Sequence, residues 1–563
     1  MKIKILLTSI LFTLIPAACA DLDLNPLSEA SNENWYSDQT EVEMALNDLY
    51  RSYAWFLEHN FETDRWTDDW AQRQYIYDYQ VGAVSSEWDK SRTMWSYSYR
   101  AISRANRVLE NIYKIEETVA EEVLNRLKAE ALFFRACFYS RLITLYGDVP
   151  LSTETLTIEK AFAMGRTSKE TVLEQIYRDF DFAIEYLPLE SSTDVKRTTK
   201  GAALAFKART ALWQSDWLTV KEAAQACMDL KKYSLYPDYG EYFRSKKFED
   251  ETIFAIPRSI SLGESWSTTN FIIRTAGGAG VAQPSWELLA TYPCTDGLPI
   301  DESPLFNPRN PFENRDPRCA ETIVEFGTAI LDYIYDPHPD ATRILQVSTG
   351  RMVTNKDTKS YTQHCSYNGL MLRKYVTQEW ADLSNTDFPI VIMRYADVLL
   401  MYAEAKIELN DIDQSVLDAI NMVRSRAYGI DISATSEYPS VTTKNQTELR
   451  KTLRTERRIE FAWEQRRFWD LQRWGLFEEA LARPYYGLLP ITDLKEKVSD
   501  AGLWFWPMTP EIDDNGFPNF DPMYDAGYIA KMIDRNFDPK QYLWPIPNSE
   551  RLINENIKQN PHY

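Results

Sequence analysis

Hydrophobic positions along this chain follow helical spacing over most of its length, with turn-forming residues between the helical stretches. Two capping patterns, Thr40-x-x-Glu43 and Thr167-x-x-Glu170, mark helix starts. Gly147 ends another helix directly after Tyr146. The predicted helices span residues 44–55, 96–113, 120–146, 167–186, 199–213, 219–230, 394–409 and 414–426. The pattern therefore predicts a mostly α-helical fold.

The longest helical stretch without glycine or proline runs from Leu449 to Trp474, and Gly475 follows it. Its apolar residues lie around the whole circumference, which is typical of a helix covered on most sides. Residues of opposite charge stand three or four positions apart, where they can pair within a helix. These pairs are Arg457–Glu460, Glu464–Arg467, Arg466–Asp470 and Asp470–Arg473. We expect one continuous internal helix that carries its own ion pairs.

Between residues 233 and 386 the helical pattern breaks, and proline, glycine, asparagine and aspartate become frequent. Short apolar runs predict strands at Thr252–Ile256, Phe271–Ile273 and, just beyond, Ile390–Met393. Irregular loops held by a rigid frame are where ligand contacts usually occur. This loop-rich region is therefore the first place to expect a ligand.

Alanines alternate with aromatic residues in three predicted helices, around residues 129–139, 202–213 and 395–405, which favours closely packed helix pairs. Seven segments, taken in order, resemble the SusD/RagB family of surface nutrient-binding lipoproteins. They are RANRVLENI from Arg104, EALFFRACFYSRLITLYGDVPL from Glu130, KGAALAFKARTALW from Lys200, NRDPR from Asn314, RYADVLLMYAEA from Arg394, TLRTERRIEFAWEQRRFWDLQRW from Thr452 and YLWPIPNSE from Tyr542. The resemblance implies a tetratricopeptide-like helix-pair scaffold with a loop-rich region and a few short strands.

The amino terminus has the pattern of a secretion signal: lysines, an apolar run from Ile5 to Ile15, then small residues. The run is too short to span a bilayer. Pro16-Ala17-Ala18-Cys19 resembles a lipoprotein cleavage box, although Pro16 stands where an aliphatic residue is usual. We expect acylation of Cys19, with ordinary cleavage after an alanine as the alternative.

These features divide the chain into a lipoprotein signal peptide (1–18), an N-terminal helical part (19–232) and a C-terminal part with the loop-rich region (233–563). We expect the last two to form one compact unit. The net charge of −21 and the pI near 4.9 argue against nucleic acid as a partner, because phosphate binding needs a basic face.

Five of the 17 tryptophans fall between residues 55 and 95, close to an aspartate cluster. Indole faces pack on the C–H faces of sugars, and carboxylates accept hydrogen bonds from sugar hydroxyls. Trp66, Asp68, Asp69 and Trp88 are therefore candidate ligand contacts. The structural alternative is that the tryptophans are core residues and that the aspartates cap a helix.

Two further candidates lie in the loop-rich region. Trp286 and Cys294 belong to a segment that resembles a family loop ending in Asp296-Gly297. Arg373 carries a guanidinium fork that can hold vicinal hydroxyls or a carboxylate, although surface ion pairing is the commoner use of such a residue.

Catalysis finds little support in the sequence, which has four histidines, none in metal-binding spacing, and no nucleophile elbow. Glu511-x-Asp513-x-Asn515-Gly516 lacks the glutamate that ends a calcium loop, since Pro522 stands at that position. We therefore predict no enzyme activity, no cofactor and no metal site.

The resemblance implies a cell-surface protein at the outer membrane that captures a glycan and passes it to a SusC-like TonB-dependent transporter. Two alternatives remain open: a helical-repeat interaction scaffold, and a lipoprotein that binds peptides without affinity for glycans. A hydrolase is a third reading, because paired carboxylates are plentiful by chance among 83 acidic residues.

Overall fold

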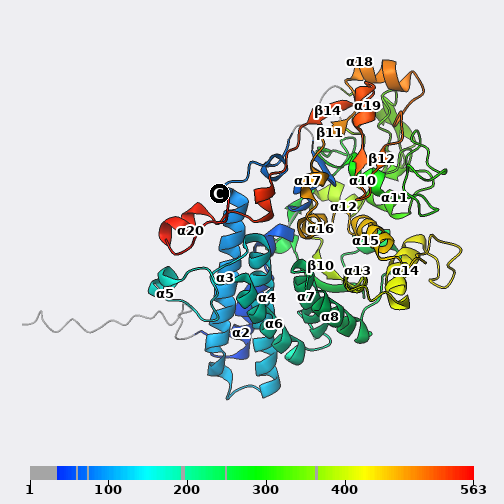
Figure 1. Ribbon diagram of the computed structural model, residues 1–563. Coiled ribbons are helices and arrows are strands. Elements are labelled where there is room, and N and C mark those ends of the chain that lie inside the picture. The colour runs from blue at the N-terminus through cyan, green and yellow to red at the C-terminus, as the bar shows by residue number, and fades with distance from the viewer. Residues whose placement is uncertain (1–34, 59–60, 73–74, 192–196, 248–249, 362–365) are drawn as a thin grey trace, which may run out of the picture.

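The computed structural model describes residues 35–58, 61–72, 75–191, 197–247, 250–361 and 366–563 (Figure 1). The predicted signal peptide and Cys19 lie outside these residues. Within them the fold is mostly α-helical with a few short strands, which confirms the predicted fold class.

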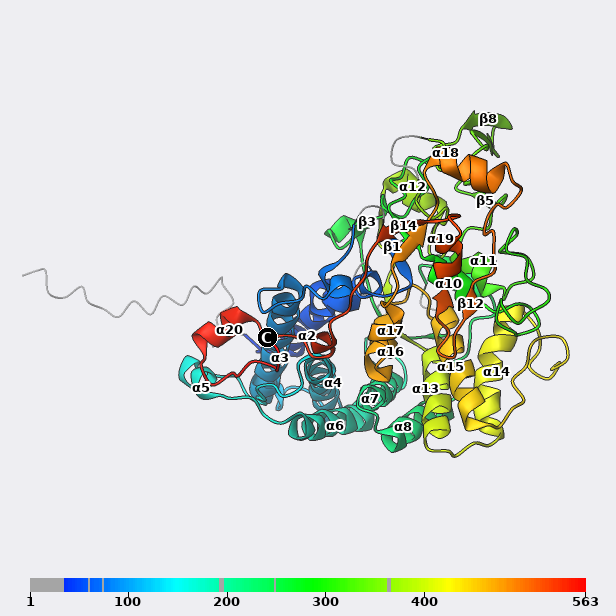
Figure 2. The same ribbon diagram turned by 45° about the horizontal axis from the view of Figure 1, so that its top comes forward.

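The long helices form a row in which each helix packs against the next, as Figure 2 shows along its lower edge. The row consists of α3 (Asp89–Asn111), α4 (Glu121–Tyr146), α6 (Lys169–Tyr186), α7 (Lys200–Trp213), α8 (Trp217–Asp229), α13 (Tyr395–Glu408) and α14 (Gln414–Tyr428). Helix α13 packs on α8 although the loop-rich region separates them in the sequence. The helical row is therefore built from both halves of the chain.

Six helices of the row start within two residues of the predicted positions, whereas α2 (Gln39–Asn47) and α3 begin five and seven residues earlier than predicted. Thr199 caps α7 by accepting a hydrogen bond from the backbone N–H of Ala202. Ser168, rather than Thr167, caps α6, and Asp38 rather than Thr40 caps α2. Shorter helices complete the helical set: α5 (Ile158–Ala163), α9 (Tyr239–Arg244), α10 (Trp286–Thr291), α11 (Arg318–Thr322), α12 (Gln378–Leu383), α17 (Phe477–Ala480), α18 (Ile491–Leu494), α19 (Asp521–Asp525) and α20 (Asn548–Ile553).

Two predicted strands pair with each other: β2 (Thr252–Ile256) runs antiparallel to β10 (Ile390–Arg394) and fixes both ends of the loop-rich region to the helices. The predicted strand at Phe271–Ile273 is wrong, because this segment turns and buries its side chains instead. The other strands are β1 (Trp70–Gln72), β3 (Trp266–Ser267), β4 (Ala282–Pro284), β5 (Ala329–Ile330), β6 (Tyr333–Ile334), β7 (Arg343–Gln346), β8 (Arg351–Thr354), β9 (Asn385–Thr386), β11 (Tyr485–Gly487), β12 (Glu511–Ile512), β13 (Pro518–Asn519) and β14 (Ala530–Ile533).

The segment predicted as one long helix is broken into α15 (Gln446–Glu460) and α16 (Arg467–Trp474). Trp463 and Gln465 have positive φ angles of 61° and 64°, which end helical geometry. The break lets the segment serve two apolar cores: Trp463 packs in the loop-rich core, while Phe468 packs among the helices. The prediction of an internal segment is confirmed, and the prediction of one continuous helix is wrong.

The break also changes the ion pairs. Asp470 pairs with Arg473 at 2.8 Å as predicted, whereas the other three predicted pairs do not form among these described residues. Glu460 pairs instead with Arg394 at 2.6 Å and with Arg318 at 2.9 Å. Buried charges thus find partners on other segments, and the network joins the loop-rich region to the helical row.

Candidate functional site

Trp66 and Trp88 lie in the helical core rather than on an open loop. Their exposed fractions are 1% and 8%, and their ring centroids are 5.4 Å apart. Trp544 packs against both rings, at 5.7 Å from Trp66 and 4.8 Å from Trp88. Because their indole faces are covered by other aromatic rings, the expectation that these tryptophans contact a ligand is wrong for this structure.

Asp68 and Asp69 are also buried, and their carboxylates bind arginines. Arg467 Nε lies 2.8 Å from Asp68 Oδ1, and Arg458 Nη2 lies 2.8 Å from both aspartates. Burial raises the pKa of Asp68, but the two guanidinium charges outweigh burial and hold this pKa below its ordinary value. Burial raises the pKa of Asp69. Both aspartates fasten the amino-terminal segment to α15 and α16, so their assignment as ligand contacts is also wrong.

Trp286 and Cys294 are fully buried in the loop-rich core. Trp286 begins α10, and its Nε1 donates a hydrogen bond to the carbonyl of Asn368 at 2.8 Å. Neither side chain reaches the surface, so both are structural here. Arg373 is partly exposed and lies 3.9 Å from Glu321, which leaves its ligand role a proposal.

The partners of the aspartates are 389 and 399 positions away in the sequence, and no local pattern reveals such contacts. One feature of the sequence does indicate that distant acidic partners exist. The segment from Leu449 to Trp474 has more arginines than acidic residues, so a buried position for it required carboxylates from elsewhere. The aspartate cluster supplies two of them.

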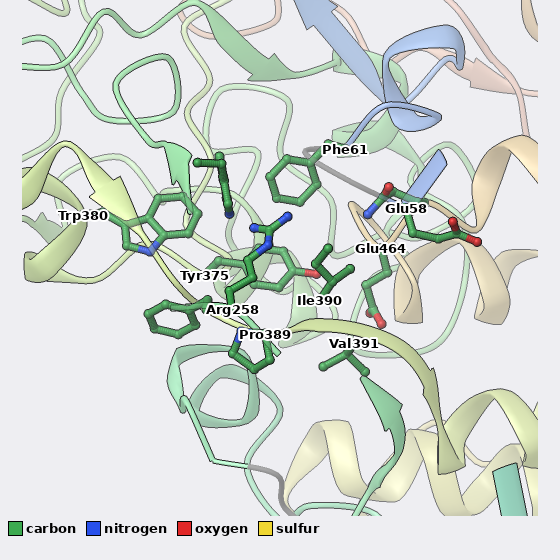
Figure 3. Close-up of a pocket in the computed structure, with 12 residues that line it drawn as sticks. Glu58, Phe61, Arg258, Tyr375, Trp380, Pro389, Ile390, Val391 and Glu464 are labelled. Atoms are coloured by element: carbon green, nitrogen blue, oxygen red, sulfur yellow. The ribbon is translucent and has the colours of Figure 1, made fainter. Parts of the chain in front are cut away.

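An aromatic pocket opens beside the break between α15 and α16, and Figure 3 shows its residues. Its walls carry five aromatic side chains: Phe61, Trp266, Tyr375, Trp380 and Phe388. The Arg258 guanidinium lies among them, 5.7 Å from the Trp266 ring centroid, and burial lowers the pKa of Arg258 to about 9. An aromatic wall with one guanidinium is suited to an apolar face that also carries hydrogen-bond acceptors.

The size of this aromatic pocket limits what it can hold. Its volume is about 50 Å³, well below the roughly 300–1,000 Å³ of small-molecule sites. Two buried acceptors in its wall, Glu58 Oε2 and Gln465 Oε1, have no hydrogen-bond partner among the described residues. The pocket can therefore accept a single donor group or a few water molecules, but not a whole sugar ring.

A more open aromatic surface lies beside β1 and β4. Tyr75 is 53% exposed, and its ring packs edge-on against Tyr77 at 4.8 Å. The β1–β4 pairing sets Gln72 opposite Ala282, next to Gln283. Gln283 Nε2 in turn donates a hydrogen bond to Ser366 Oγ at 3.0 Å. These contacts bring three separate loop segments together.

The loop segments that meet beside β4 also carry basic side chains over tyrosine rings. The Arg274 guanidinium lies 5.0 Å from the Tyr361 ring centroid, and Lys359 Nζ lies 4.6 Å from that of Tyr367. The Arg274 backbone is fixed by Asp357, whose Oδ1 accepts its N–H at 2.7 Å. We call the set the tyrosine face; it comprises Tyr75, Tyr77, Arg274, Lys359, Tyr361 and Tyr367. Its partly exposed rings and cationic donors suit the C–H faces and hydroxyls of a sugar.

Comparison with known proteins agrees with this fold. A family model described as "SusD family" matches residues 250–563, and one described as "Starch-binding associating with outer membrane" matches residues 22–212. The chain belongs to the SusD family. The resemblance found in the seven sequence segments is thereby confirmed.

Relatives of the SusD family match over the whole chain. SusD-like protein P2 of Formosa agariphila is 25% identical over 590 residues and is covered completely, as is this chain. A SusD-like carbohydrate binding protein from Bacteroides fragilis is 28% identical, with a TM-score of 0.75 over 93% of this chain and 99% of that one. A second SusD-like protein from Bacteroides fragilis is 25% identical, with a TM-score of 0.72 over 96% of this chain and 100% of that one.

No helix in the described part of the chain combines the length and the hydrophobicity that crossing a bilayer requires.

Proposed function

We propose that this SusD-family protein captures glycans at the cell surface and passes them to a SusC-like TonB-dependent transporter in the outer membrane. The observation that carries the proposal is the full-length match to SusD-family proteins, one of which is described as carbohydrate binding. The tyrosine face supports the proposal, since its partly exposed rings each lie beside another ring or a cationic donor.

A glycan microarray tests the ligand class. The purified protein is expected to bind at least one group of oligosaccharides and to leave a matched peptide array unlabelled. Binding to peptides with no glycan bound would replace the proposal by the peptide-binding alternative. Binding to neither array would favour the interaction scaffold.

The tyrosine face is tested by the double variant Tyr75→Ala with Tyr361→Ala. Each aromatic contact contributes about 0.5–1.5 kcal/mol, so loss of both is expected to weaken affinity by about five- to 140-fold. Tyr113→Ala is the matched control, because Tyr113 is 59% exposed in the short 3₁₀ turn Ile112–Ile115 that follows α3 and is not part of the tyrosine face. Equal losses in both proteins would remove the tyrosine face from the proposal.

The lipid anchor is a separate part of the proposal and rests on the sequence around Cys19. Wild-type protein is expected to incorporate labelled fatty acid and to sediment with membranes, and Cys19→Ala is expected to lose both properties. A Cys19→Ala protein that remains in the membrane fraction, together with an unlabelled wild type, would refute acylation.

The transporter partnership is tested by affinity purification from detergent-solubilised outer membranes of the source cells. Recovery of a TonB-dependent porin in near-stoichiometric amount is the expected result. If no such porin is recovered, the proposed delivery of the glycan to a transporter is refuted, and only the proposed capture of the glycan remains. The proposal assigns no catalytic step to the chain, and oligosaccharides are expected to be recovered uncleaved after long incubation.

A further inference from the structure

A second cavity lies among the helices, between α3, α4 and the two short helices α5 and α20. Figures 1 and 2 both show α5 and α20 side by side next to α3. Aromatic rings of Trp95, Tyr99 and Tyr139 line the side formed by the long helices. Ala161 and Glu550 line the opposite side. We call this space the helix cavity.

The helix cavity is large enough for a small molecule. Its volume is about 350 Å³, within the roughly 300–1,000 Å³ found for small-molecule sites. The aromatic pocket beside the break of α15 and α16 measures only about 50 Å³. A sugar-sized ligand therefore fits the helix cavity and not the aromatic pocket.

Polar contacts, rather than core packing, hold the cover of the cavity in place. Neither α5 nor α20 buries a residue. Asn554 Nδ2 donates to the carbonyls of Ala161 and Met164 at 3.0 and 2.9 Å, and Asn556 Nδ2 donates to that of Phe162 at 3.0 Å. These hydrogen bonds hold α5 and α20 in place although neither helix is packed into the core. The space between them and α3 can therefore stay open, whereas core side chains would close an empty space.

One face of α3 presents a polar stripe to the helix cavity. Ser96, Tyr99, Ser103 and Asn106 follow the spacing i, i+3, i+7 and i+10, which places them on one side of a helix. The Tyr99 hydroxyl donates to the carbonyl of Pro150 at 2.8 Å, and Asn106 donates to that of Ser152 at 3.2 Å. Ser96 is partly exposed and Ser103 is exposed, so a ligand can reach both hydroxyls.

The charge of the lining selects against anionic ligands. The lining contains two carboxylates, Glu154 and Glu550, and no lysine or arginine, which disfavours an anion. Glu154 is already paired with Lys160 at 2.7 Å. Burial raises the pKa of Glu550, against the opposing hydrogen bond from Trp95.

We propose that the helix cavity is a ligand site for a neutral, hydroxyl-rich molecule of about one sugar ring, bound between Tyr99 and the hydroxyls of Ser96 and Ser103. The partly exposed Tyr99 ring offers apolar contact to C–H groups, and the serines donate and accept hydrogen bonds. A cationic group cannot accept the hydrogen bonds that the two serine hydroxyls donate, whereas a polyol can accept hydrogen bonds from both serines. The site is separate from the tyrosine face and does not depend on it.

The experiment is saturation-transfer NMR with methyl β-D-glucopyranoside and methyl β-D-galactopyranoside as probes. It uses protein that carries Tyr75→Ala and Tyr361→Ala, so that the tyrosine face does not contribute. Ser96→Ala with Ser103→Ala removes two hydrogen bonds and is expected to weaken binding about tenfold or more. Ser103→Trp fills the cavity and is expected to abolish the signal. Ser549→Ala, an exposed serine on α20 that does not line the cavity, is the matched control and is expected to change nothing.

Glucosamine and glucuronate at neutral pH provide the charged comparisons, and both are expected to bind more weakly than the methyl glycosides. Three results would each overturn the proposal: no transfer to either methyl glycoside, unchanged transfer in the serine variants, or tighter binding of glucosamine. Should Ser103→Trp fail to fold, the double alanine variant decides alone. The NMR result does not depend on glycan binding at the tyrosine face, because the measured protein already carries Tyr75→Ala and Tyr361→Ala.

Discussion

Replacing Asp68 by asparagine removes a negative charge that two buried arginines share. Arg458 and Arg467 each place a nitrogen 2.8 Å from an oxygen of this carboxylate, and the Asp68 side chain is fully buried. Removing one partner of a buried ion pair costs about 3–5 kcal/mol, because the remaining charges stay buried. The entropy of unfolding is about 2.1 cal/mol/K per residue, which gives about 1.2 kcal/mol/K for 563 residues. The thermal midpoint is therefore expected to fall by about 3–4 °C.

Scanning calorimetry measures this shift, and titration calorimetry well below the midpoint measures glycan affinity of the same samples. Asp514→Asn is the matched control, since Asp514 is 91% exposed and solvent screens its pair with Lys451. Asp68→Asn is expected to lose stability and to keep its affinity. An Asp68→Asn protein with the wild-type midpoint and no glycan binding would show that the carboxylate contacts the ligand after all.

Three further predictions concern stability. Arginines hold the pKa values of Asp68 and Glu460 below their ordinary range against the effect of burial, so the stabilisation they give is present above the unfolded-state pKa and is lost in acid. The unfolding free energy should therefore fall between about pH 5 and pH 2 in urea titrations, less steeply in Asp68→Asn than in wild type. In Gly201→Ala the new Cβ would lie 2.3 Å from the Tyr233 hydroxyl oxygen, so a loss of about 1–3 kcal/mol is expected, and an unchanged urea midpoint would contradict the close packing of α7. Gln465→Gly relieves a φ of 64° and is expected to gain about 1 kcal/mol, whereas a loss would mean that the Gln465 side chain outweighs the backbone strain.

The helices could be predicted from the sequence because their signals are local. Apolar spacing, capping residues and terminal glycines located α4 and α7 to within a residue at each end. The break after Glu460 carried no such signal, since neither glycine nor proline marks it. It arises from a tertiary requirement: Trp463 stacks on Trp70 at 4.5 Å in one core, while Phe468 belongs to the other.

The candidate site illustrates the same limit. Tryptophan beside aspartate is typical both of a sugar site and of a buried ion-paired cluster, and only distant partners distinguish the two. Asp68 meets Arg467 399 positions away, a contact that no local pattern encodes. The tyrosine face could not be predicted from the sequence either. Tyr75 and Tyr361 are far apart along the chain, and no local pattern marks either of them as a ligand contact.

We propose that this protein holds glycans on its tyrosine face, while the buried tryptophans and aspartates only support the fold. Titration calorimetry with the tightest-binding oligosaccharide from the array tests this claim most directly. We expect the heat of binding to fall sharply in Tyr75→Ala with Tyr361→Ala and to persist in Asp68→Asn at a temperature where both are folded. Full affinity in the tyrosine variant, with binding lost in Asp68→Asn, would contradict the account.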